Sequence, residues 1–304
     1  MLKNQTKAYI YTGLTIAAWS TVSTAFKISL RTFSPAGLLL IASVSSLLIL
    51  ALIMLFYTKP RRISIKEVFT DLYKSLLPGL LNPLLYYLVL LNAYNVLRAQ
   101  EAQVLNYTWA IVLSVFSIIF LKQKFRIRDL IALTFSLIGV VIIATRGAVT
   151  ELRFDNLTGS ALALGSSIIW AAYWIINLKD SREPIKKLYF NFLIGSLFLI
   201  LYILIGRIPL LQTGAAISTM PLLAGIYVGC FEMGITFFLW FKALSLSDNT
   251  AKISNLIFVT PFISLIFIGL LLKESIAPAT IIGLILIVVS NIYQKAARAQ
   301  SSVS

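Results

Sequence analysis

The feature that most constrains this chain is a series of long apolar runs separated by short basic segments. A bilayer hydrocarbon core of about 30 Å is crossed by about 20 helical residues. Because lipid offers no hydrogen-bond partners, each run must satisfy its backbone internally as a helix. Ten runs have a suitable length, at approximately 8–28, 36–57, 75–95, 102–121, 129–146, 158–178, 188–206, 219–241, 251–272 and 276–294. The sequence therefore predicts an all-α membrane protein with ten transmembrane helices.

The composition excludes several other classes of protein. Charged residues are 12% of the 304, about half the share of a typical soluble chain. The first apolar run lacks a small-residue cleavage site, so we expect it to be kept as the first helix. The chain has no histidine and one cysteine, Cys230, which argues against zinc, haem and iron–sulfur sites. We expect no metal and no cofactor.

The net charge of +15 raises the question of nucleic-acid binding, but the positions of the charges argue against it. Lysine and arginine gather in the segments between apolar runs. With the N-terminus inside, about 19 of the 26 basic residues fall on the inner side. This asymmetry is typical of the cytoplasmic face of membrane proteins. It predicts a multi-pass protein of a bacterial inner membrane with both termini cytoplasmic.

The chain repeats itself at a period of about 150 residues. Trp19 aligns with Trp170, LLPG at 76–79 aligns with LLAG at 222–225, and Lys122 aligns with Lys273. We therefore divide the chain into repeats at 1–150 and 151–304. Because each repeat has five predicted helices, equivalent helices cross the membrane in opposite directions. Inverted repeats of this kind are typical of transporters whose substrate site lies near the midplane.

These features resemble the drug/metabolite transporter superfamily, EamA-type, over about residues 8–294. The resemblance rests on the aligned tryptophans, LNAYNVLRAQEAQVLNYTW at 91–109 and WFKALSLSDNTAKISNLIFVTPFISLIFIGLLLKES at 240–275. EAQVLNYTW and IWAAY at 169–173 are most similar to the aromatic amino-acid exporter subgroup. The resemblance implies a central cavity lined by helices 1, 3, 4, 6, 8 and 9. The chain departs from the family pattern at Ala110, where proline is usual, and at 122–124, which lacks the acidic residue that Glu274 supplies in the second half.

Glu232 is the acidic residue nearest the middle of a predicted span. A carboxylate at the bilayer centre is costly unless it is paired, hydrated or protonated, so it is a functional candidate. It could hold a substrate ammonium group or exchange protons. The alternative is a structural acid that hydrogen-bonds between helices.

Polar and aromatic side chains within the other spans are candidates for a substrate cavity, because such groups should turn away from lipid. Aromatic rings suit a planar or zwitterionic organic solute. Hydrogen bonding between helices and aromatic belts at the membrane surface are the alternatives. With Glu232, the candidates are Trp19, Ser20, Asn82, Tyr86, Asn106, Tyr107, Trp109, Trp170, Tyr173, Thr236 and Asn255.

Glycines and prolines inside the spans carry a structural prediction. Gly225 and Gly229 share a predicted helix face with Glu232 and Thr236, and their spacing favours close helix packing over ligand contact. Pro83 and Pro261 fall inside predicted helices, where proline bends the helix as a static kink or as a hinge.

The energy source follows from what the sequence lacks. No phosphate-binding GxxxxGK[ST] motif occurs, so transport must be facilitative or coupled to an ion gradient. The isolated acid and the absence of histidine argue against a membrane enzyme. We expect a secondary transporter for small organic metabolites, first of all amino acids, that exports its substrate by alternating access. A lipid or lipid-linked-intermediate flippase and a multidrug exporter are the alternatives. The expected partners are the small-molecule substrate, the bilayer and, if Glu232 exchanges protons, protons. We expect the chain to act as a monomer or a homodimer.

Overall fold

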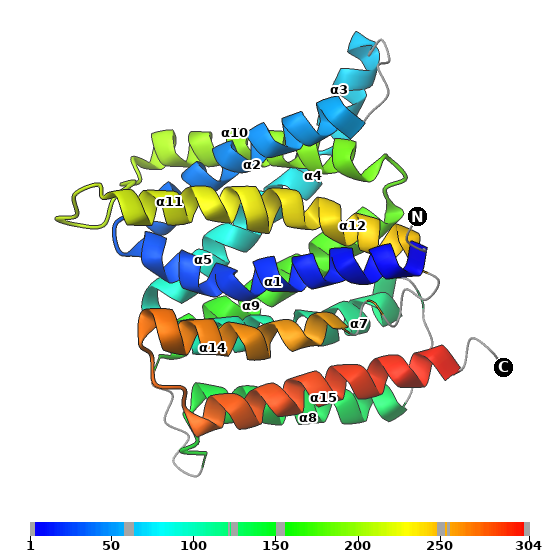
Figure 1. Ribbon diagram of the computed structural model, residues 1–304, viewed down its shortest axis with the longest axis vertical. Coiled ribbons are helices and arrows are strands. Elements are labelled where there is room, and N and C mark those ends of the chain that lie inside the picture. Colours follow the sequence, from blue (N-terminus) through cyan, green and yellow to red (C-terminus); the bar gives the residue numbers. More distant parts are fainter. Residues whose placement is uncertain are drawn as a thin grey trace.

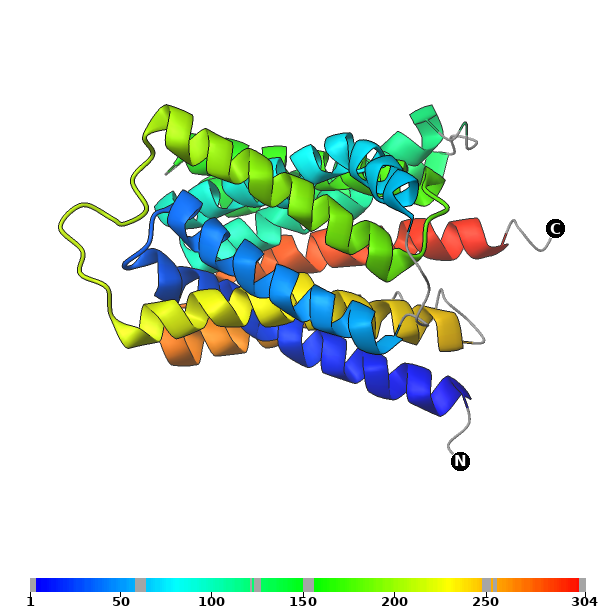
Figure 2. The same ribbon diagram turned by 90° about the horizontal axis from the view of Figure 1, so that it is seen from above.

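A computed structural model describes residues 4–57, 64–120, 122, 127–149, 156–247, 253 and 256–300. Over these ranges the chain is helical and has no strand beyond an isolated bridge between Phe33 and Leu211. The long helices run side by side (Figures 1 and 2). The start of α1 and the end of α15 lie at the same end of the bundle. The fold class predicted from the sequence is therefore confirmed as an all-α membrane fold.

The helices follow the predicted apolar runs closely. Six stretches are long and apolar enough to cross a membrane, within 35–56, 76–96, 99–120, 157–179, 184–206 and 219–246. Shorter apolar helices occupy 130–144, 257–272 and 278–293, and the 27-residue α1 is richer in polar residues. The total of ten spans stays a prediction. The elements are α1 (Asn4–Leu30), α2 (Pro35–Tyr57), α3 (Ile65–Lys74), α4 (Leu76–Gly79), η1 (Leu80–Leu85), α5 (Tyr86–Val96), α6 (Ala99–Asn106), α7 (Trp109–Phe120), α8 (Ile127–Ala144), α9 (Leu157–Lys179), α10 (Pro184–Gly206), α11 (Thr219–Tyr227), η2 (Val228–Ile235), α12 (Thr236–Leu246), η3 (Ile257–Val259), α14 (Thr260–Leu272) and α15 (Pro278–Gln300).

The helices pack in three groups, each drawn from both halves of the chain. The first group contains α1, α2, α11, η2, α12 and α14, which contact one another around α1 and α2. The second contains α4, η1, α5, α6, α7, α9 and α10, centred on α5 and α9. The third is the pair α8 and α15, at the lower edge of Figure 1. Each group therefore contains helices of both repeats. A contact between the first and second groups can join two helices of the same repeat.

Two irregular segments occupy corresponding places in the two repeats. The first-half span is interrupted by a kink at η1, directly after LLPG at 76–79, where Asn82 has a non-helical backbone next to Pro83. The second-half span changes from α-helix to the wider π-helix at η2, shortly after LLAG at 222–225. Lys122 and Lys273, which the sequence aligned, both adopt a left-handed backbone, with φ of 53° and 57°. These shared irregularities agree with a two-repeat fold.

Glycines allow the first group to pack closely around η2. A Cβ on Gly229 would meet the carbonyl oxygen of Ala42 and lie 2.6 Å from Cβ of Ser45 on α2. A Cβ on Gly225 would lie 3.1 Å from both Ile41 and Ser29. The sequence-based interpretation of these glycines as packing residues is therefore confirmed.

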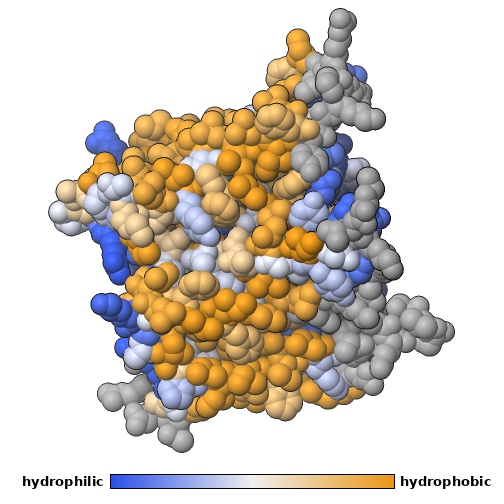
Figure 3. Space-filling model, in the orientation of Figure 1, coloured by the Kyte–Doolittle hydropathy of each residue, from blue (hydrophilic) through white to orange (hydrophobic). Residues whose placement is uncertain are grey.

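The surface is that of a membrane protein. In the face drawn in Figure 3, apolar residues cover the middle of the bundle and hydrophilic residues gather at its two ends. Large side chains such as Leu204, Ile205 and Leu270 are 68%, 81% and 70% exposed. Because burial in lipid replaces burial in protein for these residues, the exposed apolar belt is expected of a multi-pass protein.

Candidate functional site

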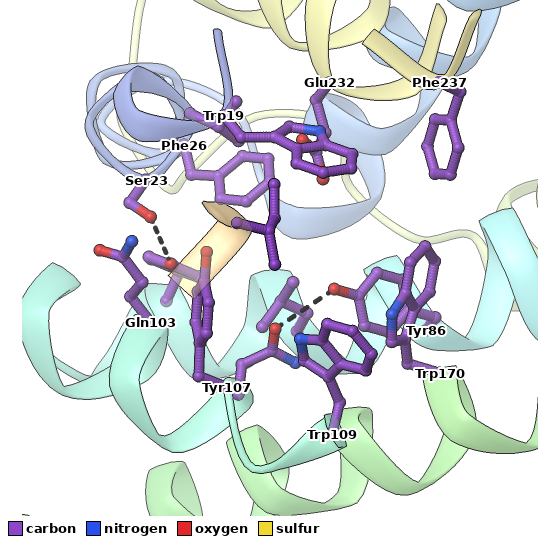
Figure 4. A pocket seen from close by; sticks show the side chains of 15 residues that line it. Trp19, Ser23, Phe26, Tyr86, Gln103, Tyr107, Trp109, Trp170, Glu232 and Phe237 are labelled. Carbon is purple, nitrogen blue, oxygen red and sulfur yellow. Dashed lines mark hydrogen bonds between the residues drawn. The ribbon is translucent and has the colours of Figure 1, made fainter. Parts of the chain in front are cut away.

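A cavity of about 100 Å³ lies between the first and second helix groups (Figure 4). Helices from both repeats contribute to it, including α1, α5, α6, α9 and η2. The fifteen lining residues are Trp19, Val22, Ser23, Phe26, Tyr86, Leu90, Tyr94, Gln103, Asn106, Tyr107, Trp109, Trp170, Glu232, Phe237 and Ile257.

Aromatic rings form most of two walls of the cavity. On one side the Trp19 ring packs against Phe237, with centroids 6.1 Å apart. On the other the Tyr86 and Trp170 rings lie 4.5 Å apart and are tilted by 30°. Trp170 is also 6.1 Å from Phe237, so the aromatic side chains of α1, α5, α9 and α12 form a connected set. Such rings offer both apolar contact and π-electron density to a bound solute.

Glu232 is the acidic residue of this cavity, and it comes from η2. Its side chain is half-buried, and Oε1 accepts a hydrogen bond of 3.0 Å from the Tyr87 hydroxyl on α5. The bond joins the first helix group to the second, because η2 and α5 belong to different groups. Among the described residues that line the cavity, no lysine or arginine accompanies this carboxylate.

The π-helix at η2 changes which side chains share the face of Glu232. In an α-helix, Thr236 would lie one turn beyond Glu232, as the sequence analysis assumed. A π-helical turn contains an extra residue, so Phe237, five positions on, lines the cavity instead. Thr236 is fully buried and is not part of the lining. Periodicity alone could not have identified this shift.

Hydrogen bonds fix the polar side of the cavity. The Tyr86 hydroxyl donates to Oδ1 of Asn106 at 3.3 Å, and Nδ2 of Asn106 donates to the Ser166 hydroxyl at 2.9 Å. The hydroxyls of Ser23 and Tyr94 share a hydrogen bond of 2.7 Å. Buried polar atoms usually have partners.

Two polar atoms of the lining residues are left over. Nε1 of Trp19 and Oε1 of Gln103 are buried and have no hydrogen-bond partner in the part of the chain that the structure describes.

Seven of the residues predicted from the sequence meet at this cavity. They are Trp19, Tyr86, Asn106, Tyr107, Trp109, Trp170 and Glu232. Ser20 lies outside the lining and donates to the carbonyl oxygens of Ile16 and Thr260. Tyr173 is buried behind the cavity, with its ring 5.7 Å from that of Trp170.

The other predicted positions lie elsewhere. Asn82 is fully buried in η1, next to Pro83, and does not line the cavity. Pro261 stands in the first turn of α14, directly after the short 3-10 helix η3, within the apolar helical segment at 257–272. Its role as a kink or a hinge stays a prediction. A first-turn proline is tolerated because its missing N–H would have no helical partner there. Asn255 lies outside the described residues.

Some lining residues were missed by the sequence analysis although a signal existed. Ser23 and Phe26 lie four and seven positions after Trp19, and so share its helix face. Leu90 and Tyr94 lie four and eight positions after Tyr86 and share its helix face in the same way. Extending each candidate along its helix face would have found them.

At the end of the bundle opposite the two termini, hydrogen bonds join the helix groups. The backbone N–H of Ala99, at the start of α6, donates to Oε1 of Glu274 at 3.1 Å. The buried Gln100 side chain donates to the carbonyl oxygen of Ser275 and accepts from the N–H of Ala277, both at 2.9 Å. These bonds tie α6 of the second group to the segment that follows α14 of the first.

Charged residues near the other end stabilise the second group. Nη2 of Arg182 lies 2.7 Å from Oδ2 of Asp180, and Nη1 donates to the Ser75 hydroxyl at 2.9 Å. Lys186 pairs with Asp71 of α3 at 2.6 Å. Burial raises the pKa of Asp180, but the hydrogen bonds and charge of Arg182 outweigh it and leave the pKa below its ordinary value.

The fold and the central cavity are those of a multi-pass membrane protein built from two repeats. The model of the EamA-like transporter family matches the chain twice, at residues 6–145 and 157–293. The chain belongs to the EamA-like transporter family, within the drug/metabolite transporter superfamily.

Proteins with similar sequences are also named as transporters. An uncharacterized transporter of Clostridium kluyveri is 26% identical over 64% of this chain, and the match spans 63% of that protein, less than two thirds of its length. The uncharacterized transporter YvbV of Bacillus subtilis is 25% identical over 71% of this chain and 69% of its own. An uncharacterized transporter of Archaeoglobus fulgidus is 24% identical over 96% of this chain and 98% of its own. A solved crystal structure matches 97% of this chain and 99% of its own with a TM-score of 0.65 at 17% identity, which supports the fold alone.

Proposed function

We propose that this protein is a secondary transporter that moves small organic metabolites carrying an ammonium group, a class that includes amino acids, by alternating access. The observation that carries the proposal is the cavity between the two helix groups, where Glu232 faces aromatic rings. A carboxylate at this depth is favoured when it has a cationic partner, and a substrate ammonium would be one. Export across an inner membrane is proposed from the resemblance to exporters.

The size of the cavity favours a small solute over a large drug or a lipid. Drug-sized ligands occupy pockets of roughly 300–1,000 Å³. The cavity here holds about 100 Å³. A flippase for anionic lipids would also need basic side chains facing its path, and the described lining has none.

Alternating access requires that the cavity open to each side of the membrane in turn. The hydrogen bonds of Gln100 and Glu274 join one helix group to the other, and we propose that they close the cavity at the end opposite the termini. Breaking these bonds would let the groups separate at that end. Glu232 and Tyr87 form a similar link at the cavity itself, so substrate binding and the separation of the groups would act on the same side chains.

Transport in proteoliposomes would test this function. Purified protein is reconstituted, and uptake of a labelled panel of amino acids and amines is measured with and without an imposed pH gradient. Saturable uptake of a group of these solutes is expected, and Glu232→Gln should reduce it at least tenfold. Glu67→Gln, on α3 away from the cavity, is the matched control and should transport normally.

The measurements with and without a pH gradient distinguish the two roles considered for Glu232, which are proton exchange and substrate binding. If it exchanges protons, uptake by the wild type should depend on the pH gradient, and Glu232→Gln should abolish that dependence. If it only binds substrate, the variant should weaken binding without a change in the response to pH. Unchanged transport by Glu232→Gln would make it a structural acid, and failure of every solute in the panel would overturn the proposed substrate class.

A further inference from the structure

The charges of the cavity are unbalanced. Glu232 contributes a carboxylate, and the described lining contributes no basic side chain to offset it. Lys27 and Arg31 are instead found around a second cavity, beyond Tyr94 toward the closed end, where Glu274 accompanies them. A solute in the central cavity therefore meets one acidic group and neutral polar or aromatic groups.

The aromatic walls add to this preference for positive charge. Trp19, Tyr86, Tyr107, Trp109 and Trp170 all line the space that Glu232 faces. An ammonium group over a tryptophan or tyrosine ring gains about 0.5–2 kcal/mol, with the larger value where water is excluded. The rings have no comparable attraction for an anion, because their faces carry negative charge density.

A substrate carboxylate would be poorly accommodated in the same place. A buried charge without a partner of opposite sign costs several kcal/mol. The unpartnered Nε1 of Trp19 is a neutral donor, which offers one hydrogen bond but no compensating charge. The carboxylate of Glu232 would also repel it.

We propose that the central cavity binds small organic monocations, with a primary or quaternary ammonium group at Glu232, and discriminates against zwitterions of the same size. This proposal rests on the proposed function and narrows it: within the solutes that carry an ammonium group, amines are favoured over amino acids. The small volume of the cavity restricts the cation to a compact head group.

Choline and glycine betaine are a matched pair of probes for this test. Both carry a trimethylammonium group on a two-carbon chain, and they differ in ending in a hydroxyl or a carboxylate. Neither crosses a bilayer freely, unlike a neutral amine. Binding to the purified full chain can be followed by intrinsic tryptophan fluorescence at constant ionic strength, because Trp19, Trp109 and Trp170 line the cavity.

Choline is expected to bind at least tenfold more tightly than glycine betaine. Glu232→Gln should lower choline affinity at least tenfold and reduce the difference between the two probes, whereas Glu67→Gln should change neither. Glu232→Asp keeps the negative charge and should retain the preference for choline. This second variant tests the proposal even if Glu232→Gln does not fold. Thermal unfolding of each variant distinguishes loss of binding from loss of structure.

The outcomes separate this proposal from the broader function. Equal binding of both probes, or tighter binding of glycine betaine, overturns the selection for cations while leaving transport of ammonium-bearing solutes intact. Binding of neither probe also overturns the monocation site. If the proteoliposome panel then shows amino-acid uptake, the proposed transport function stands and the monocation site is rejected. If the panel shows no uptake, the transport function and the monocation site are both rejected.

Discussion

Gln100→Leu is the substitution that should most directly open the closed end of the cavity. The Gln100 side chain is fully buried and forms two hydrogen bonds of 2.9 Å with the backbone of Ser275 and Ala277. Leucine has a similar size but can form neither bond. The Ser275 carbonyl and the Ala277 N–H would then be left without these partners in the closed state and could bind water in an open one.

The expected magnitude follows from those two bonds. A hydrogen bond contributes about 0.5–1.5 kcal/mol net, so two contribute roughly 1–3 kcal/mol to the closed state. A shift of that size changes the ratio of open to closed molecules by about 5- to 150-fold. The neighbouring bond from Ala99 to Glu274 would remain and would still favour the closed state.

Labelling of a cavity cysteine measures this shift. In a Cys230→Ser background, Leu90→Cys places a thiol in the cavity lining, and a membrane-impermeant maleimide is added to intact cells. Gln100→Leu should raise the labelling rate at least fivefold. Asn92→Leu is the matched control, because the Asn92 amide donates to the carbonyl of Leu88 on its own helix, at 2.8 Å, and not to the other helix group within the described residues. An unchanged rate in a folded Gln100→Leu variant would refute the idea that these bonds hold the cavity closed.

Three further predictions concern packing, pH and the membrane surface. Gly229→Ala should destabilise the protein by about 1–3 kcal/mol, because the added Cβ would overpack against α2. Gly165→Ala is the control: a Cβ there would meet no atom within 4 Å, so this change should be neutral or stabilise the protein by up to about 1 kcal/mol. Thermal unfolding of both variants in detergent measures the difference. The lowered pKa of Asp180 means that its ion pair stabilises the fold above pH 3.8 and is lost as the pH falls below that value, so the melting temperature of the wild type should fall more than that of Asp180→Asn between pH 7 and pH 3. A spin label at Phe69→Cys, on the exposed apolar face of α3, should be relaxed more by oxygen than by a water-soluble nickel complex, and a label at Thr70→Cys should show the reverse, because an amphipathic helix lies with its apolar face in the membrane surface.

The candidate site shows where inference from periodicity succeeds and where it stops. Glu232 and the inward-facing aromatics could be found from the sequence, because a charge or polar ring inside an apolar run has few stable environments in a bilayer. Thr236 was expected beside Glu232, but the π-helix at η2 brings Phe237 there instead. No local rule applied to the sequence marked that change of pitch.

Interactions between distant segments were also beyond the reach of the sequence. Tyr87 lies 145 positions before Glu232 and donates to it. Gln100 forms hydrogen bonds with residues 175 and 177 positions later in the chain. The repeat predicted that the halves correspond to each other, but not that helices from both would mix within each packing group.

The sequence by itself determined that the chain folds as apolar helices in two repeats, because hydrocarbon leaves helical backbone as the stable choice for such runs and the pattern of residues is local. The tertiary structure decided which polar and aromatic side chains meet around Glu232 and which distant segments form hydrogen bonds with each other. Those outcomes depend on helix pitch and on contacts between segments far apart in the chain, which are properties of the packed bundle and not of any one run.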